Sequence, residues 1–192
     1  MREPVKNIKK QLLSDAKYTT SEYTFDYVLD KEGNLESQKR IVFDHGDGAS
    51  VLMYNKRRST VILTRQFRLP SYLNGNSDGL LIEVCAGMLD GDSPEDCIRK
   101  EAIEETGYEL QHIEKVFAPY ASPGVMTEIA HLFIAEYTES RRIGKGGGLA
   151  EEHEHIEVLE FNFNEAYHMV ENGTIKDART IMLLQHLKIK GL

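Results

Sequence analysis

A short segment near the middle of the chain predicts a buried strand, a tight turn and a capped helix in immediate succession. Leu80–Cys85 is an almost continuous apolar run, and residues 86–92 form a turn that is rich in glycine and aspartate. Ser93 is a helix N-cap followed directly by proline, and Gly107 is the expected C-terminal stop. We therefore expect a helix over Pro94–Thr106, joined to a buried strand by a short connection.

This helix carries three carboxylates on one side. Glu101, Glu104 and Glu105 are spaced by three and four residues, which places them within an arc of roughly 100° that contains no basic residue. Like charges at this spacing destabilise an isolated helix by about 0.2–0.5 kcal/mol per pair. Such a cluster is either a solvated helix face or part of a cation site, and Mg²⁺ prefers oxygen ligands of this kind. The turn and caps around the cluster favour the metal site.

The composition is that of an ordinary globular protein with one sizeable core. The 192 residues are 41% apolar and 28% charged, and the net charge of −8 argues against a nucleic-acid binder. Cys85 and Cys97 make no disulfide framework and suit a reducing compartment. The first residues lack the apolar core of a secretory signal, and no apolar run reaches the roughly 18 residues of a membrane span. A cytoplasmic enzyme that does not bind membranes is expected.

The N-terminal region predicts a small β element. Tyr23–Leu29 and Ser37–Phe43 alternate apolar and polar residues around a turn at residues 30–34. An isolated hairpin is only marginally stable in water, so this one must pack on something else. The glycine-containing break at Asp44–Gly48 follows. We expect an N-terminal β element over residues 1–44 and a main domain over residues 45–192.

The main domain alternates strands and helices. Besides the central strand and helix, the pattern predicts strands at Ala49–Tyr54, Thr60–Arg65, Glu114–Ala118, Ala130–Tyr137 and Ile156–Phe161, and helices at Asn164–Asn172 and Ala178–Lys188. Antiparallel pairs mixed with a few helices indicate an α+β fold or α-β-α layers.

Gly87–Tyr108 resembles the Nudix box, the loop–helix signature of enzymes that hydrolyse nucleoside diphosphates linked to another moiety. The matching core residues are Glu101, Ala102, Ile103, Glu104, Glu105, Gly107 and Tyr108. Three features depart from the signature: the loop is one residue short, Asp92 replaces a glutamate, and Lys100 replaces an arginine. Lysine keeps the positive charge of arginine but loses its bidentate fork.

The resemblance extends along the chain to the branch of the Nudix family that acts on nucleotide sugars. It is carried by Arg65–Arg68, Asn74–Asn76, Cys97–Glu101, Ser122–Gly124 and Phe133–Tyr137. It implies a mixed sheet between helices, and a homodimer in which the N-terminal β element swaps onto the partner subunit. The implied reaction is metal-dependent hydrolysis of the diphosphate bond of a nucleoside diphosphate sugar, with GDP-mannose giving GMP and mannose 1-phosphate.

Two alternatives stay open at this point. The Ser122–Gly124 turn is shared with enzymes that hydrolyse ADP-ribose or ADP-sugars, so an ADP-ribose pyrophosphatase is the nearer rival. The second is a catalytically silent Nudix domain that senses a nucleotide. Such modules usually lose glutamates of the box, whereas Glu101, Glu104 and Glu105 are all present here.

The box residues are the expected metal and catalytic groups. Glu101 and Glu105, four residues apart on one helix face, are the metal ligand pair that the spacing itself supports. The resemblance adds the backbone carbonyl of Ala86 as a ligand. It leaves Glu104 as a ligand through water or a helper that orients its neighbours. Mg²⁺ is the expected cofactor, with Mn²⁺ as the alternative.

A second acidic group follows the glycine-rich stretch 144–148. Glycine-rich loops beside active sites often act as mobile lids, although a solvated flexible loop is the simpler interpretation. The resemblance implies that Glu154 binds metal or acts as general base, and Glu152 is its rival because the local loop is longer than in relatives. Glu154 or Glu105 would take the proton of the attacking water.

Substrate contacts are expected from basic residues, from residues 86–88 after the buried strand, and from Glu128. Arg65 and Arg68 lie at the end of a predicted strand, where a planar guanidinium suits a diphosphate, and the resemblance favours Arg68. Lys39 and Arg40 are expected to contact the nucleotide across the dimer, unless they only protect a sheet edge. The resemblance implies further substrate contacts from Ala86, Gly87, Met88 and Glu128.

Overall fold

The computed structural model describes residues 3–149, 151 and 154–191. By packing, the chain divides into two units, which are described separately below. The first is Met1–Asp47 with Tyr120–Ile129, and the second is Gly48–Pro119 with Ala130–Leu192. The division at residue 44 expected from the sequence stays a prediction, because packing does not test whether either part folds alone.

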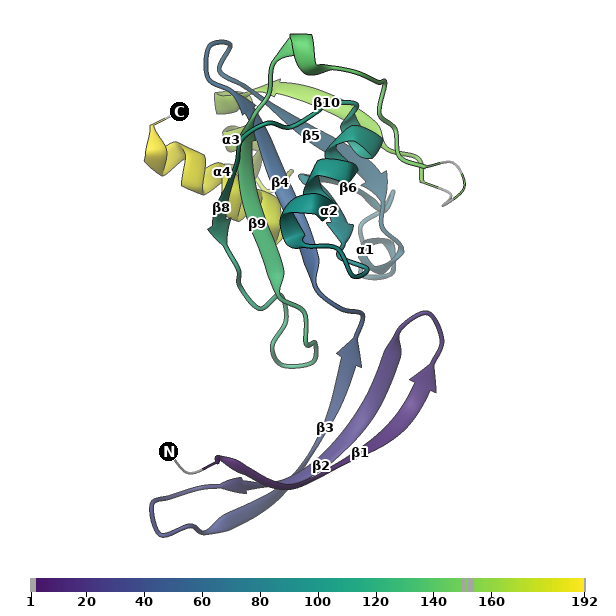
Figure 1. Cartoon of the computed structure of the whole chain (residues 1–192), viewed down its shortest axis with the longest axis vertical. Coiled ribbons are helices and arrows are strands. Elements are labelled where there is room, and N and C mark those ends of the chain that lie inside the picture. Colours follow the sequence, from purple (N-terminus) through teal and green to yellow (C-terminus); the bar gives the residue numbers. More distant parts are fainter. Residues whose placement is uncertain (1–2, 150, 152–153, 192) are drawn as a thin grey trace. The chain divides into compact units, whose positions relative to one another are not determined.

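The first unit contains a three-stranded antiparallel sheet in the order β1-β2-β3 (Figure 1). Its strands are β1 (Val5–Asp15), β2 (Thr19–Val28) and β3 (Leu35–Asp44). The predicted hairpin is confirmed as β2 and β3, whereas β1 was not foreseen. Two register shifts interrupt the pairing of β1 with β2, so its sequence lacks the strict alternation that identifies a strand.

A loop from the second half of the chain completes the first unit. Met126 forms a β-bridge with Phe43, and the Phe43 N–H donates to the Val125 carbonyl at 2.8 Å. The Thr127 hydroxyl donates to Asp44 at 2.9 Å. The turn Ser122–Gly124 and the predicted substrate residue Glu128 both belong to this loop.

The second unit is built on a mixed sheet. Its main path is β10-β5-β4-β9-β8, in which only the pairing of β4 with β9 is parallel. The strands are β4 (Gly48–Asn55), β5 (Thr60–Phe67), β6 (Leu80–Glu83), β7 (Cys85–Met88), β8 (Ile113–Phe117), β9 (Ala130–Glu136) and β10 (Glu157–Asn162).

The central strands β4 and β5 pair directly only near their shared turn. Beyond that point β6 pairs with β5 and β7 pairs with β4, so the segment Leu80–Met88 fills the space where the two long strands separate. Val84 is the residue at which the segment changes partner. The expected tight turn is therefore shorter than its prediction, because residues 85–88 extend as strand β7 and only residues 89–92 turn back.

Helices cover both faces of this sheet (Figure 1). They are α1 (Leu69–Leu73), α2 (Pro94–Glu101), the π-helix η1 (Ala102–Thr106), the 3₁₀ turn η2 (Glu139–Arg141), α3 (Phe163–Glu171) and α4 (Ala178–Lys190). Alternate strand residues face opposite sides, so Val51 and Met53 pack with α2 while Leu52 packs with α3 and α4. The predicted α+β fold with a mixed sheet between helices is confirmed; α1 and the π-helical end of the box helix were not predicted.

Candidate functional site

The start of the box helix is fixed by its own side chains. The Ser93 hydroxyl accepts a hydrogen bond from the Asp96 N–H at 3.2 Å, as an N-cap should. Asp92 N–H donates to the Leu89 carbonyl at 2.7 Å, which closes the turn from β7. The last turn is π-helical, a form often found at functional sites, and it ends at Gly107 with a left-handed φ of 79°. The carboxylates thus extend from a helix that is anchored at both ends.

Glu105 is the most buried carboxyl group of the box. It is 2% exposed, and its Oε2 accepts a hydrogen bond from the Ala86 N–H at 3.2 Å. Burial raises the pKa of Glu105 to about 8; the negative charges of Glu101 and Glu154 add to this rise, while hydrogen bonds from Cys85 and Ala86 oppose it. Without a cation, this carboxyl group is therefore mainly protonated at neutral pH.

Glu101 lies directly over β7 because Gly87 has no side chain. A Cβ atom built on Gly87 would lie 2.1 Å from the Glu101 Oε1 and 2.3 Å from its Cδ, closer than any real contact. The glycine therefore allows the carboxylate to approach the strand backbone. The structure thus brings the helix residues Glu101 and Glu105 close to the strand residues Ala86 and Gly87.

The glycine-rich loop is bound to the C-terminal end of the box helix. The N–H groups of Gly147 and Gly148 donate to the carbonyls of Glu105 at 2.8 Å and Glu104 at 3.1 Å. A Cβ on Gly146 would lie 2.4 Å from the Glu105 carbonyl oxygen. The loop thus satisfies carbonyl groups that a helix end leaves unpaired, and Glu104 takes part through its backbone.

Glu154 is held by the same loop. Its Oε2 accepts a hydrogen bond from the Leu149 N–H at 3.2 Å, and a Cβ on Gly148 would lie 2.7 Å from that carboxylate oxygen. Its negative charge is felt at Glu105, so the structure brings the second acidic group to the box. The rival residue Glu152 lies outside the described residues.

The acidic groups fit a hard divalent cation that receives only some of its ligands from protein side chains. Within the described part of the chain, no three His, Cys, Asp or Glu side chains converge closely enough to form a metal site by themselves. Mg²⁺ usually binds through one or two carboxylates together with waters and substrate phosphates. A cation held by Glu101, Glu105 and the Ala86 carbonyl would stabilise the ionised form of Glu105, which burial disfavours.

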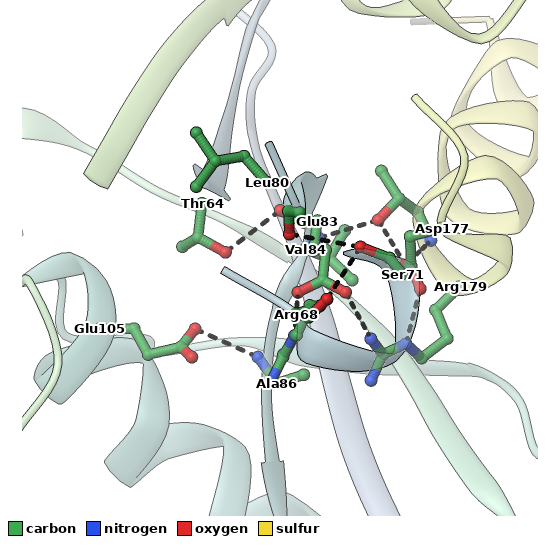
Figure 2. Close-up of polar contacts among 12 residues, drawn as sticks. Thr64, Arg68, Ser71, Leu80, Glu83, Val84, Ala86, Glu105, Asp177 and Arg179 are labelled. Carbon is green, nitrogen blue, oxygen red and sulfur yellow. Dashed lines mark hydrogen bonds and ion pairs between the residues drawn. The ribbon is translucent and has the colours of Figure 1, made fainter. Parts of the chain in front are cut away.

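Arg68 is held by the buried carboxylate of Glu83, which is not among the predicted site residues. Its Nε donates to Glu83 Oε2 at 2.8 Å, and Arg179 Nη2 lies 3.2 Å from Glu83 Oε1 (Figure 2). The Glu83 side chain is only 3% exposed. Burial raises the pKa of Glu83, while the two guanidinium groups lower it. Arg65, the other predicted candidate, is bound to Glu157 on the neighbouring strand β10.

The N-terminus of α4 is hydrogen-bonded to the strand segment that contains Glu83 and Val84 (Figure 2). Asp177 is the N-cap of α4 and accepts hydrogen bonds from the N–H of Thr180 at 2.9 Å and from its hydroxyl at 2.7 Å. The Thr180 hydroxyl in turn accepts the Val84 N–H at 2.8 Å. Asp177 also pairs with Arg179 Nε at 3.1 Å.

Three of the remaining predicted substrate residues, Lys39, Arg40 and Glu128, belong to the first unit. Lys39 and Arg40 are exposed on β3, where Lys39 pairs with Glu22 at 2.9 Å. Glu128 lies 3.4 Å from His45, and both side chains are mostly buried. Their roles in binding substrate stay predictions. Met88, in the second unit, is the last residue of β7, next to Gly87.

Two signals in the sequence could have indicated the missed residues. Glu83 is the only charged residue in the apolar run Leu80–Cys85, and a charge in a buried strand requires a partner. Asp177 precedes a helical pattern as an N-cap does. Neither signal identifies Arg179 as a partner of Glu83, because 96 residues separate them.

Comparison with known proteins assigns the fold and the box to one family. Residues 44–184 match the model of the NUDIX domain. The chain belongs to the Nudix family. Its N-terminal residues 4–43 match a second model, the GDP-mannose pyrophosphatase NudK N-terminal domain. Nudix hydrolases generally use divalent metal ions, in keeping with the acidic groups around Ala86.

Curated Nudix relatives match over their whole length. A GDP-mannose pyrophosphatase of Pectobacterium atrosepticum is 54% identical over 191 residues, covering 100% of this chain and 97% of the relative. Proteins of the same name from Cronobacter sakazakii and Escherichia coli are 52% and 48% identical, and cover 98% and 100% of this chain and 97% and 99% of the relatives. None of the described helices is long and apolar enough to cross a membrane.

Proposed function

We propose that this chain is a Mg²⁺-dependent pyrophosphatase that hydrolyses GDP-mannose to GMP and mannose 1-phosphate. The observation that carries the proposal is the full-length similarity to proteins named GDP-mannose pyrophosphatase, which includes the N-terminal domain as well as the box. The arrangement of Glu101 and Glu105 beside Ala86 supports the same chemistry independently.

In the proposed mechanism, Glu101, Glu105 and the Ala86 carbonyl would hold the cation. A bound Mg²⁺ would neutralise phosphate charge and lower the pKa of a coordinated water. Glu105 must lose its proton for this role, and the loss is opposed by its burial. Glu154 or Glu105 accepts the proton of the attacking water, and Glu104 orients its neighbours through the helix end.

The substrate is held by basic and backbone groups in this proposal. Arg68 binds the diphosphate through its planar guanidinium. The strand residues Gly87 and Met88 contact the substrate beside the metal ligands. Lys39, Arg40 and Glu128 of the first unit contribute further substrate contacts. Of these, Lys39 and Arg40 reach the nucleotide of the partner subunit in a homodimer.

The buried thiols support a cytoplasmic location for this enzyme. Cys85 and Cys97 are both unpaired and buried, and burial raises the pKa of each thiol. A reducing compartment keeps such residues as thiols.

A substrate panel tests the proposal. GDP-mannose, GDP-glucose, ADP-ribose and dinucleoside polyphosphates are each incubated with Mg²⁺ or with EDTA, and phosphate is measured after coupling to a phosphatase. We expect metal-dependent turnover with the highest kcat/KM for GDP-mannose. A decisive preference for ADP-ribose would replace the substrate and keep the chemistry. Nucleotide-sugar binding without turnover at any divalent metal would indicate a sensing domain.

The metal ligands are tested by a variant in the same assay. Glu101→Gln keeps the size of the side chain and removes the negative charge, so turnover should fall by about 10²-fold or more while the fold persists. A folded variant with near wild-type turnover would refute the assignment of Glu101 as a ligand.

A further inference from the structure

We propose that Glu83 is a positioning residue that fixes the guanidinium of Arg68 for the substrate diphosphate. The inference rests on the proposed function, since it concerns the group that binds the diphosphate. It goes beyond that function by assigning a role to a buried carboxylate outside the box.

Glu83 is placed by the sheet and bound on both of its oxygen atoms. It lies opposite Thr64 at the end of β6, and the Thr64 hydroxyl donates to its carbonyl at 3.3 Å. Oε2 accepts from Arg68 Nε and Oε1 from Arg179 Nη2. A carboxylate that is 3% exposed and shared by two guanidinium groups has little freedom to rotate.

The hydrogen bond that Arg68 donates to Glu83 leaves the two terminal nitrogens of the guanidinium available for an anion. Only Nε of Arg68 is used, and neither terminal nitrogen forms a hydrogen bond with another residue in the described part of the chain. The Arg68 side chain is 37% exposed. Its backbone N–H is fixed to the Gly79 carbonyl at 2.8 Å, so backbone and side chain are both held. The terminal nitrogens then form a preorganised pair of donors for phosphate oxygens.

The same strand segment connects this arginine with the box. Glu83 holds Arg68, and three residues further on the N–H of Ala86 donates to Glu105. Between them, the Val84 N–H is anchored to Thr180 on α4. The position of Arg68 relative to Ala86 and Glu105 is therefore set by four consecutive residues, 83–86, whose backbone is held on both sides.

A double-mutant cycle separates positioning of Arg68 from a purely structural ion pair. Glu83→Gln, Arg68→Gln and the double variant are compared for kcat and KM with GDP-mannose and Mg²⁺. We expect Glu83→Gln to lower kcat/KM by about 10–100-fold when Arg68 is present, and by less than about twofold when Arg68 is already glutamine. Equal losses in both backgrounds, or no loss, would overturn the proposal.

Matched variants control for loss of an ion pair and for misfolding. Glu139→Gln removes the carboxylate that pairs with Arg58, far from the segment 83–86 in sequence, and should leave kcat/KM unchanged. Circular dichroism and thermal unfolding establish that each variant is folded. If Glu83→Gln does not fold, Glu83→Asp takes its place in the cycle, because it keeps the charge and shortens the reach to Arg68. The same dependence on Arg68 is then expected, and its absence overturns the proposal.

Binding of inorganic pyrophosphate distinguishes failure of this inference from failure of the proposed function. Calorimetry with Mg²⁺ and pyrophosphate requires no turnover. Glu83→Gln should weaken pyrophosphate binding at least tenfold, again only when Arg68 is present. If the wild-type protein hydrolyses no nucleotide sugar, the proposed function fails while this measurement still decides the role of Glu83. Unchanged pyrophosphate affinity in Glu83→Gln would refute that role.

Discussion

At the scale of single residues, the protonation of Glu105 predicts how stability depends on pH. Its pKa is raised from 4.5 to about 8, so between these values the unfolded chain loses a proton that the folded protein keeps. The contribution of Glu105 to the free energy of unfolding is therefore largest below pH 4.5. It is lost as the pH rises through about 8. The loss is on the order of a few kcal/mol, since each pKa unit corresponds to about 1.4 kcal/mol.

Denaturant unfolding in EDTA between about pH 5 and about pH 8 measures this contribution. Glu105→Gln should reduce the fall in stability with pH, whereas the partly exposed Glu104→Gln should retain it. The contribution of buried Glu83, whose pKa is also raised, remains in both variants. Equal pH slopes for Glu105→Gln and the wild type would contradict the prediction.

Gly87 predicts a specific loss of activity without a loss of fold. In Gly87→Ala the new Cβ displaces the flexible Glu101 carboxylate, so kcat/KM should fall about 10²-fold while the midpoint of thermal unfolding changes little. Gly124→Ala is the control, because nothing lies within 4 Å of its Cβ and neither glycine has a positive φ. Comparable activity in the two variants would show that the close approach of Glu101 is unimportant.

Individual residues were predictable where the partners are close in sequence. The spacing of Glu101 and Glu105 on one helix identified them as neighbours. Glu83 and Arg179 depend on how β6 and α4 pack, and no local pattern encodes that contact. The burial of Glu105 and its bond to Ala86 likewise required the sheet to be known.

At the scale of elements, the loop at residues 144–148 predicts a cost for any side chain at Gly146. Its φ is +69° and a Cβ would lie 2.4 Å from the Glu105 carbonyl oxygen, so Gly146→Ala should destabilise the protein by about 1–3 kcal/mol. The same change should lower kcat, since Glu154 is held by this loop. Denaturant unfolding and steady-state kinetics measure the two effects.

Gly144→Ala is the matched control within the loop. Its nearest neighbour would lie at 3.7 Å and its φ is not positive, so stability and kcat should stay close to wild type. Combining Gly146→Ala with Glu154→Gln tests the route of the effect. If kcat is lower in the double variant than in Glu154→Gln alone, the effect of Gly146→Ala does not pass through Glu154.

Elements with regular periodicity and clear caps were predicted well, and those defined by their partners were not. The helices α3 and α4 agree with their predictions within two residues. The last three residues of β7, Ala86–Met88, fall in the predicted turn because the glycine at position 87 favours one, and they become a strand only by pairing with β4. Helix α1 has five residues and no buried side chain, which leaves no apolar face to detect.

At the scale of the whole molecule, the N-terminal sheet predicts a homodimer. Ser21 is the only buried residue in its three strands, while Ile8 and Ile41 are 62% and 54% exposed. A sheet of this size needs a covered apolar face to be stable. We expect a second copy of the chain to be that partner, in the swapped arrangement that the resemblance implies.

Sedimentation at micromolar concentration should give twice the mass of the chain. Ile41→Glu should weaken the dimer, and Glu36→Gln, at an exposed position on the opposite face of the same strand, should not. Activity measured across the dissociation range shows whether the dimer is needed. A fully active monomer at micromolar concentration would contradict the prediction.

The change of partner at Val84 makes one short segment intolerant of any change in length. A residue inserted or deleted within Leu80–Met88 would reverse which side chains point to each face, and would exchange Glu83 and Ala86 for their neighbours. The adjoining connection at residues 69–79 has no such constraint, because its two ends are joined by the bond between Arg68 and Gly79. Variation in length among relatives should therefore gather in that connection, where the substrate side of the enzyme can diverge while the hydrolytic chemistry is inherited unchanged.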